Sequence, residues 1–184
     1  MPKHNLLQLL DSYAERYPDE CDNIAQMRAL VAGEPRCFER DCFVPGHITG
    51  SAWVVDTRGQ ALLLTHHKKL NMWLQLGGHS DGDSDTLGVA MREAREEGGV
   101  AVVALWEEIF DIDIHAIPAR KQDPAHQHFD VRFVLQARSD AVVVSDESNA
   151  LNWVAITEIE NYTHETSILR MRDKWLRLKN DIYQ

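Results

Sequence analysis

The stretch that decides the fold reads GGHSDGDSDTLGVAMREAREEGGV and runs from residue 77 to residue 100. It begins as a polar loop in which Ser84 or Asp85 can cap the N-terminus of a helix. Apolar residues at helical spacing predict that helix from Thr86 to Glu97, with one apolar face made of Leu87, Ala90, Met91 and Ala94. Two glycines follow at Gly98-Gly99 and permit a left-handed turn that ends the helix. The stretch therefore consists of a loop, a helix and a turn that ends the helix.

A second face of this helix carries three carboxylates, Glu93, Glu96 and Glu97, at positions i, i+3 and i+4. Side chains at this spacing lie close together within about one turn, so their like charges repel. A hard divalent cation such as Mg²⁺ or Mn²⁺ would turn that repulsion into attraction. On its own, such a face is more often a solvated acidic surface, so the surrounding sequence has to decide between the two interpretations.

The surrounding sequence resembles the Nudix hydrolase family over its whole motif, the Nudix box, from Gly78 to Val100. That motif reads Gly, five residues, Glu, seven residues, Arg-Glu, aliphatic, any residue, Glu-Glu, any residue, Gly, aliphatic. The matching positions at the right spacing are Gly78, Arg92-Glu93, Ala94, Glu96-Glu97 and Gly99-Val100. A chance match of the six fixed positions is on the order of one in 10⁵. The resemblance implies a Nudix-like α/β/α sandwich around a mixed sheet.

The same resemblance implies an enzyme, a metal-dependent hydrolase that cleaves a phosphoanhydride bond of a nucleoside diphosphate linked to another moiety. Its cofactor would be Mg²⁺ or Mn²⁺, held by Glu93, Glu96 and Glu97 together with the Gly78 carbonyl. Which carboxylate takes a proton stays open, because all three share one small face. Some family members use a further acidic residue before a late Trp-bearing strand, and Glu147 matches it by its distance from Trp153, with Asp146 as a second choice.

One box position departs from the family, because Ser84 stands where the motif has its first glutamate. In the family that glutamate organises the loop and pairs with the box arginine, so we expect Asp83 or Asp85 to pair with Arg92 instead. The departure also keeps an alternative open: a catalytically weak or silent Nudix domain that binds a nucleotide metabolite as a sensor or interaction module.

Other side chains are candidates for contact with the substrate. His79 follows the box glycine and either contacts phosphate or structures the loop. Lys69, or its neighbour Lys68, either meets a substrate phosphate or lies in a solvated turn.

Four polar residues alternate along one strand and therefore share a face, namely His126, His128, Asp130 and Arg132. His128 would belong to a polar wall that faces the substrate, and Arg132 would contact an anion. A second metal site on this face and a plain surface role are the alternatives.

The rest of the chain predicts an α/β fold in a single domain, 1–184. Residues 1–44 form a helical extension, with a hairpin of two helices at His4–Tyr17 and Asp19–Ala32, which we interpret as simple packing, a substrate lid or a dimer contact. Residues 45–184 form the core. The expected strands are His47–Asp56, Ala61–Leu64, Val100–Leu105, Ile109–Ile117, Phe129–Ala137 and Leu151–Ile156, and a C-terminal helix is expected at Ser167–Ile182.

The composition limits the classes of partner that the chain is expected to bind. The chain has 19 Lys and Arg against 29 Asp and Glu, a formal net charge of −10, so attraction to nucleic acid or an anionic membrane is disfavoured. A small-molecule nucleotide-type diphosphate is the expected partner, and a homodimer is possible. Three cysteines without CxxC spacing argue against a disulfide framework. With no apolar run long enough to span a bilayer and no signal peptide, we expect a cytoplasmic location.

Overall fold

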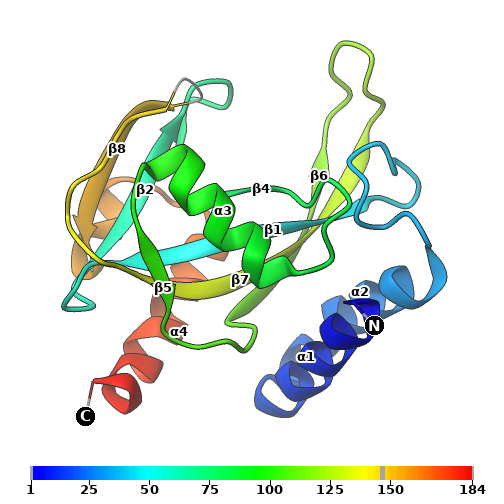
Figure 1. Ribbon diagram of the computed structural model, residues 1–184, viewed down its shortest axis with the longest axis horizontal. Coiled ribbons are helices and arrows are strands. Elements are labelled where there is room, and N and C mark those ends of the chain that lie inside the picture. Colours follow the sequence, from blue (N-terminus) through cyan, green and yellow to red (C-terminus); the bar gives the residue numbers. More distant parts are fainter. Residues whose placement is uncertain (1, 146–147, 184) are drawn as a thin grey trace.

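The computed structural model describes residues 2–145 and 148–183. In these ranges the chain forms an α/β fold in which helices cover both faces of one mixed sheet (Figure 1), as the sequence predicts. The helices are α1 (Pro2–Arg16), α2 (Cys21–Gly33), α3 (Thr86–Gly98) and α4 (Thr166–Ile182), with short 3₁₀ helices at Pro18–Glu20 and Ile156–Asn161. The strands are β1 (His47–Val55), β2 (Ala61–His67), β3 (Met72–Leu74), β4 (Leu76–His79), β5 (Val102–Ala104), β6 (Asp111–Ile117), β7 (His126–Ala137) and β8 (Ser148–Ala155).

Strand β1 lies at the centre of the sheet. It runs parallel to β7 along its whole length, from the His47–His128 pair to the Val55–Gln136 pair. On its other edge, the N-terminal half of β1 pairs with β4, whereas β2 pairs only with its last residue, Val55. Strands β2 and β4 therefore leave β1 at different points, and a cavity is lined by residues of β1, β2 and β4.

The ends of α3 are fixed by the residues that the sequence singles out. The Asp85 side chain accepts a hydrogen bond from the Gly88 amide at 3.1 Å, so Asp85 is the N-cap. Gly99 ends the helix with a φ of 61°, in the left-handed region that favours glycine. Between these ends, Val89, Ala90 and Ala94 are fully buried against the sheet. Local capping and an apolar face together hold the glutamate face of α3 towards the cavity.

The position of α3 on the sheet depends on Gly50 of β1. A Cβ atom at this position would lie 2.8 Å from Cγ1 of Val89 and 2.9 Å from the carbonyl oxygen of Thr86. The backbone carbonyl of a helix cannot rotate out of the way, so we expect Gly50→Ala to lower the free energy of unfolding by about 1–3 kcal/mol in urea denaturation. Gly33→Ala is the control, because its new Cβ meets nothing within 4 Å. It should change the free energy of unfolding by less than about 1 kcal/mol. Equal losses in both variants would contradict the packing argument.

The two faces of the sheet have separate cores, because successive side chains of β1 point to opposite sides. Ile48, Ala52 and Val54 belong to the core under α3, which also takes in residues of α1 and α2. Trp53 and Val55 belong to the second core, which α4 covers with Ile168, Met171 and Trp175. All of these side chains are fully buried. The three-layer arrangement that the sequence predicts is thus present.

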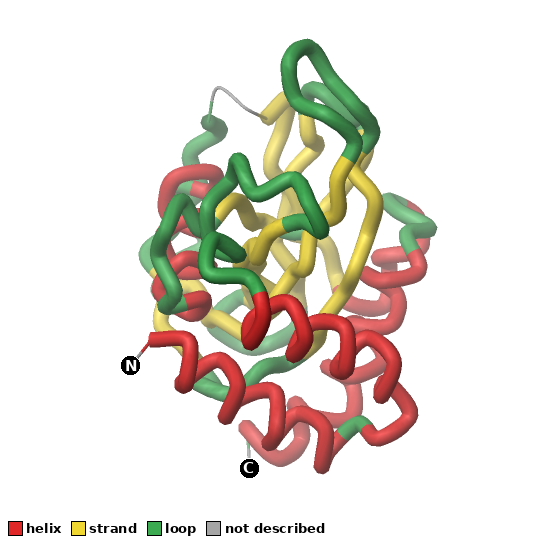
Figure 2. The backbone as a smooth tube through the Cα atoms, turned by 90° about the vertical axis from the view of Figure 1, so that its right-hand side faces the viewer, coloured by secondary structure: helices red, strands yellow, loops and turns green. Residues whose placement is uncertain are grey.

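The N-terminal helices α1 and α2 lie side by side at one end of the molecule (Figures 1 and 2). Leu6, Leu10 and Met27 are buried in the same core as residues of β1 and β7. A buried lysine of α4 ties the pair to the rest of the fold, because Lys174 Nζ donates to the Tyr13 hydroxyl at 2.6 Å and pairs with Glu20 at 2.5 Å. Packing against the core is therefore one function of this extension.

All four helices begin and end within two residues of the predicted bounds, and each predicted strand has a counterpart. The sequence analysis missed β3 and β4, because β3 has only three residues and β4 contains Gly77 and Gly78, which have low strand propensity.

The three cysteines are free thiols, of which Cys37 and Cys42 are buried. Among the described residues, the helices are too short or too polar to cross a membrane.

Candidate active site

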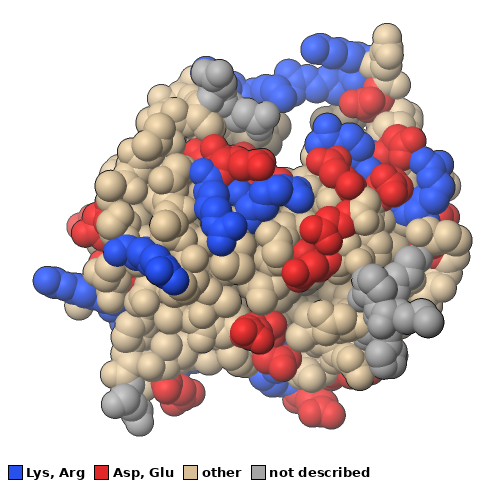
Figure 3. All heavy atoms as spheres, viewed as in Figure 1, with Lys and Arg blue, Asp and Glu red and all other residues tan. Residues whose placement is uncertain are grey.

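A cavity of about 470 Å³ opens between β1, β4, β7 and the glutamate face of α3. Acidic and basic side chains gather around a hollow at the upper edge of the face that Figure 3 shows. The charged and histidine side chains that line the cavity are Glu93, Glu96, Glu97, Asp81, Asp130, Arg40, Arg92, Lys69, His67, His79, His115 and His128. The three box glutamates therefore share one cavity, as the sequence predicts.

Strand β4 holds two of these glutamates in place. The Glu97 carboxylate accepts a hydrogen bond from the Gly77 amide at 3.0 Å, and the residue is 8% exposed. Glu93 lies directly against Gly78, where an added Cβ would be only 2.5 Å from a Glu93 oxygen. The absence of a side chain at Gly78 thus lets the Glu93 carboxylate reach the backbone of β4. Gly77 supplies its amide and Gly78 supplies space, so both glycines of β4 help to shape the site.

The charge on Glu93 is balanced by its neighbour in the box. Burial raises the pKa of Glu93, while the Arg92 guanidinium, 3.0 Å away, acts in the opposite direction. Arg92 also donates to the His79 carbonyl oxygen at 2.7 Å, which joins the helix to the end of β4. A cation bound among the glutamates would lower the pKa of Glu93 again, since it would favour the ionised carboxylate.

The expectation that Asp83 or Asp85 pairs with Arg92 is wrong. Asp85 caps α3, and the Asp83 carboxylate accepts a hydrogen bond from the Asp85 amide at 2.9 Å, so both are engaged in forming the turn. The arginine finds its partners in Glu93 and the His79 carbonyl instead. Ser84 therefore stands in a loop that organises itself without the box glutamate.

The structure places His79 and His128 on the cavity wall. Burial, with the nearby Arg40 charge and the ring of His47, lowers the pKa of His79 to about 4. Burial and the neighbouring imidazoles lower the pKa of His128 to about 2. Both rings are therefore neutral at neutral pH, and they offer hydrogen bonds to a substrate but no positive charge.

Besides Arg92, positive charge at the cavity comes from Lys69 and Arg40. Lys69, a candidate from the sequence, lines the cavity. Arg40 was missed by the sequence analysis. It lies in the loop between α2 and β1, and its guanidinium pairs with Asp81 at 2.6 Å. Its presence at the cavity shows that the N-terminal extension supplies a side chain to the site, which no local pattern around Arg40 signals.

Arg132 does not line the cavity, so its expected contact with an anion is wrong. The side chain is 2% exposed, and its guanidinium is surrounded by carboxylates, with Asp130 at 2.7 Å and Asp111 at 3.0 Å. Asp130 in turn accepts hydrogen bonds from Thr49 and Ser51, each at 2.8 Å. Alternation along β7 correctly placed these residues on one face, but at Arg132 that face is closed by the carboxylates of Asp111, Asp113 and Asp130.

Glu147 and Asp146, the candidates for a further acidic residue, lie outside the described residues. The donor set that is described consists of Glu93, Glu96 and Glu97 with the Gly78 backbone alongside. Carboxylate and carbonyl oxygens are the ligands that Mg²⁺ and Mn²⁺ prefer, so the residues at this site fit such an ion.

Comparisons with known proteins identify the family and the fold of this chain. The family model described as the NUDIX domain matches residues 46–174. Among solved structures, a NUDIX family hydrolase from Clostridium perfringens is 23% identical, covers 72% of this chain and 97% of its own, and has a TM-score of 0.53. A C. elegans Ap4A hydrolase is 15% identical, with coverages of 73% and 98% and a TM-score of 0.54. An E. coli dihydroneopterin triphosphate pyrophosphohydrolase is 14% identical, with coverages of 69% and 92% and a TM-score of 0.56.

At these identities the structural likenesses show the fold alone. A comparison with curated proteins gives no match.

Proposed function

Because the chain belongs to the NUDIX domain family, we propose that it is a metal-dependent hydrolase that cleaves a phosphoanhydride bond of a nucleoside diphosphate linked to another moiety. The observation that carries the proposal is the convergence of Glu93, Glu96 and Glu97 on one cavity beside Gly78. A pure binding module has no need for three carboxylates that repel one another.

Glu93, Glu96, Glu97 and the Gly78 carbonyl would hold Mg²⁺ or Mn²⁺. When bound, the ion would supply positive charge for the diphosphate oxygens and lower the pKa of an attacking water. The chain's own residues position the reactants, which accounts for much of the catalysis in phosphoryl transfer. Lys69 supplies positive charge to the outer phosphate oxygens, and neutral His79 and His128 donate or accept hydrogen bonds along the wall. Glu147 remains a proposed further acid or metal ligand.

A substrate screen tests this function. We would assay nucleoside triphosphates, nucleotide sugars, ADP-ribose, dinucleoside polyphosphates, dihydroneopterin triphosphate and coenzyme A with Mg²⁺ and with Mn²⁺, measuring release of phosphate or nucleotide. We expect turnover of at least one compound, and its loss when the metal is chelated. Tight binding of a nucleotide without turnover of any compound would favour the alternative, a silent domain that acts as a sensor.

The proposal includes a small molecule as partner and the cytoplasm as location. The formal net charge of −10 disfavours nucleic acid and anionic membranes as partners. An anionic small molecule would be held by the cations at the cavity and by the metal. The possible homodimer remains a prediction.

Replacing Ser84 separates the enzyme from the sensor. The loop is already held by the Asp85 cap and by the contact between Arg92 and the His79 carbonyl. We therefore expect Ser84→Glu to change kcat/KM by less than about tenfold, or about 1.4 kcal/mol in the barrier, for a substrate found in the screen. A rise of about a hundredfold would show instead that the natural protein is an impaired hydrolase. Ser139→Glu, in an exposed turn, controls for the added charge.

A further inference from the structure

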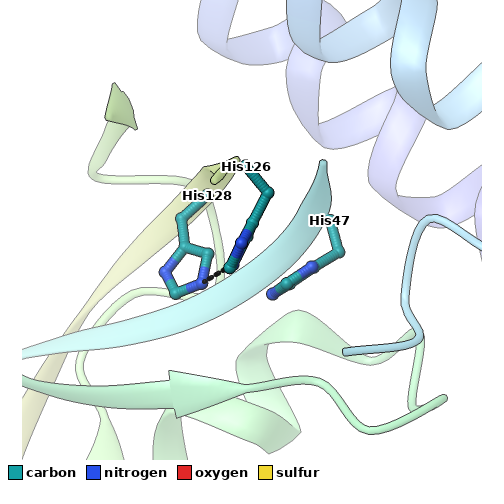
Figure 4. Close-up of side chains that lie close together, drawn as sticks. All are labelled: His47, His126 and His128. Carbon is teal, nitrogen blue, oxygen red and sulfur yellow. Dashed lines mark hydrogen bonds between the residues drawn. The ribbon is translucent and has the colours of Figure 1, made fainter. Parts of the chain in front are cut away.

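Five of the nine histidines gather at one end of the cavity. Three of them, His47, His126 and His128, bring one ring nitrogen each to within 4.8 Å of the others. Figure 4 shows the three rings turned towards a common point, with His47 on β1 and the other two on β7. The parallel register of these strands pairs His47 with His128, so the fold itself brings the rings together.

The hydrogen bonds of two rings fix which nitrogen is available. The Nδ1 atom of His47 lies 3.1 Å from the Cys42 carbonyl oxygen, and Nδ1 of His126 lies 2.8 Å from the Pro124 carbonyl oxygen. A carbonyl oxygen only accepts, so both Nδ1 atoms carry the proton and both Nε2 atoms present a lone pair. A carbonyl that holds the distal N–H is the arrangement commonly seen behind metal-binding histidines.

The Nε2 atom of His47 is otherwise unexplained. The residue is fully buried, and this atom has no hydrogen-bond partner among the described residues. Leaving a buried polar nitrogen unpaired is costly unless a ligand satisfies it. This lone pair faces a cluster of histidines, so a metal ion bound there would satisfy it.

The remaining contacts suit a metal of one class. The Nε2 atoms of His126 and His128 lie 3.3 Å apart and share a hydrogen bond (Figure 4). The edge of a tetrahedral site with Zn–N bonds of 2.0–2.1 Å is also about 3.3 Å, so a bound ion could replace that hydrogen bond with little movement of the rings. Three imidazoles without a carboxylate favour Zn²⁺ and its late first-row neighbours over Mg²⁺.

We propose that His47, His126 and His128 form a binding site for a Zn²⁺-class transition metal, separate from the glutamate site. His128 lines the cavity, so the ion would lie at its edge, with a fourth position left for water or a substrate oxygen. Two charged groups act on His47, namely Arg40 and Asp81. They form an ion pair with each other, so they leave the site without a net repelling charge. The site would link the start of β1 to the start of β7 when the metal is bound.

Calorimetry on the full-length, metal-free protein tests the site, with Zn²⁺ as titrant and Mg²⁺ in excess to occupy the glutamates. We expect one Zn²⁺ per chain. His126→Gln, at a half-buried position, should weaken binding by about a hundredfold or more, since loss of a residue behind a ligand already costs 10–100-fold. The matched control His164→Gln, at an exposed position, and the variant Glu93→Gln should bind Zn²⁺ as the wild type does.

Equal affinity in His126→Gln and wild type would overturn the proposal, and so would a comparable loss in Glu93→Gln. If His126→Gln does not fold, X-ray absorption of the wild-type Zn²⁺ complex decides. Scattering from imidazole rings would support the site, and a shell of oxygen atoms alone would exclude it. These measurements need no substrate, so their outcome is independent of whether hydrolysis is found.

Discussion

Glu97→Gln should lower kcat by about two to four orders of magnitude while the protein stays folded. Loss of one anionic ligand weakens both the position of the cation and its stabilisation of charge in the transition state, effects worth several kcal/mol. The fold should respond little, because the amide oxygen of glutamine can still accept the hydrogen bond that the Gly77 amide now donates to Glu97. We expect a change of about 1 kcal/mol or less in the free energy of unfolding.

The measurement is kcat at saturating Mg²⁺ for a substrate from the screen, together with a thermal melt of each protein. Glu158→Gln is the matched control, because it removes one negative charge from an exposed position away from the cavity. That variant should keep kcat within about twofold. If Glu97→Gln retains more than about a tenth of wild-type kcat, Glu97 does not hold the metal, and Glu93 or Glu96 takes that role.

Features that depend on neighbours in the sequence could be predicted. The glutamate spacing, the Asp85 cap and the Gly99 stop all lie within one helix and its ends, so their geometry follows from helical periodicity. The position of this helix over one cavity with Lys69, His79 and His128 was expected only through the resemblance to a family.

Features that depend on pairing between distant strands could not be predicted. His47 meets His126 and His128 because β1 and β7 run parallel in one register, and no local pattern specifies that register. The same pairing, with β6 on the other side of β7, buries Arg132 among carboxylates. Arg40 reaches the cavity from a loop of the N-terminal extension. In each case the side chain was visible in the sequence, but its surroundings were not.

The carboxylates around Arg132 lead to the second large effect, which concerns stability. Asp111 is fully buried and contacts three cations: Arg132 at 3.0 Å, Arg170 at 2.8 Å and Lys174 at 2.7 Å. Arg170 and Lys174 belong to α4, and Lys174 also contacts Tyr13 of α1. One carboxylate therefore connects β6, β7, the C-terminal helix and the N-terminal helices.

We expect Asp111→Asn to lower the free energy of unfolding by about 3–5 kcal/mol, because it removes the one carboxylate that all three cations share while the shape of the side chain stays nearly the same. Asp130, Asp113 and Glu20 would then have to balance these cations alone. At roughly 2–4 °C per kcal/mol for a chain of this size, the Tm should fall by about 6–20 °C. Urea denaturation and a thermal melt measure both quantities. Asp181→Asn removes an equal charge from an exposed position near the end of α4 and should change stability by less than about 0.5 kcal/mol. A loss below about 1 kcal/mol in Asp111→Asn would mean that the cations find other partners, and that apolar packing alone holds the terminal helices to the sheet.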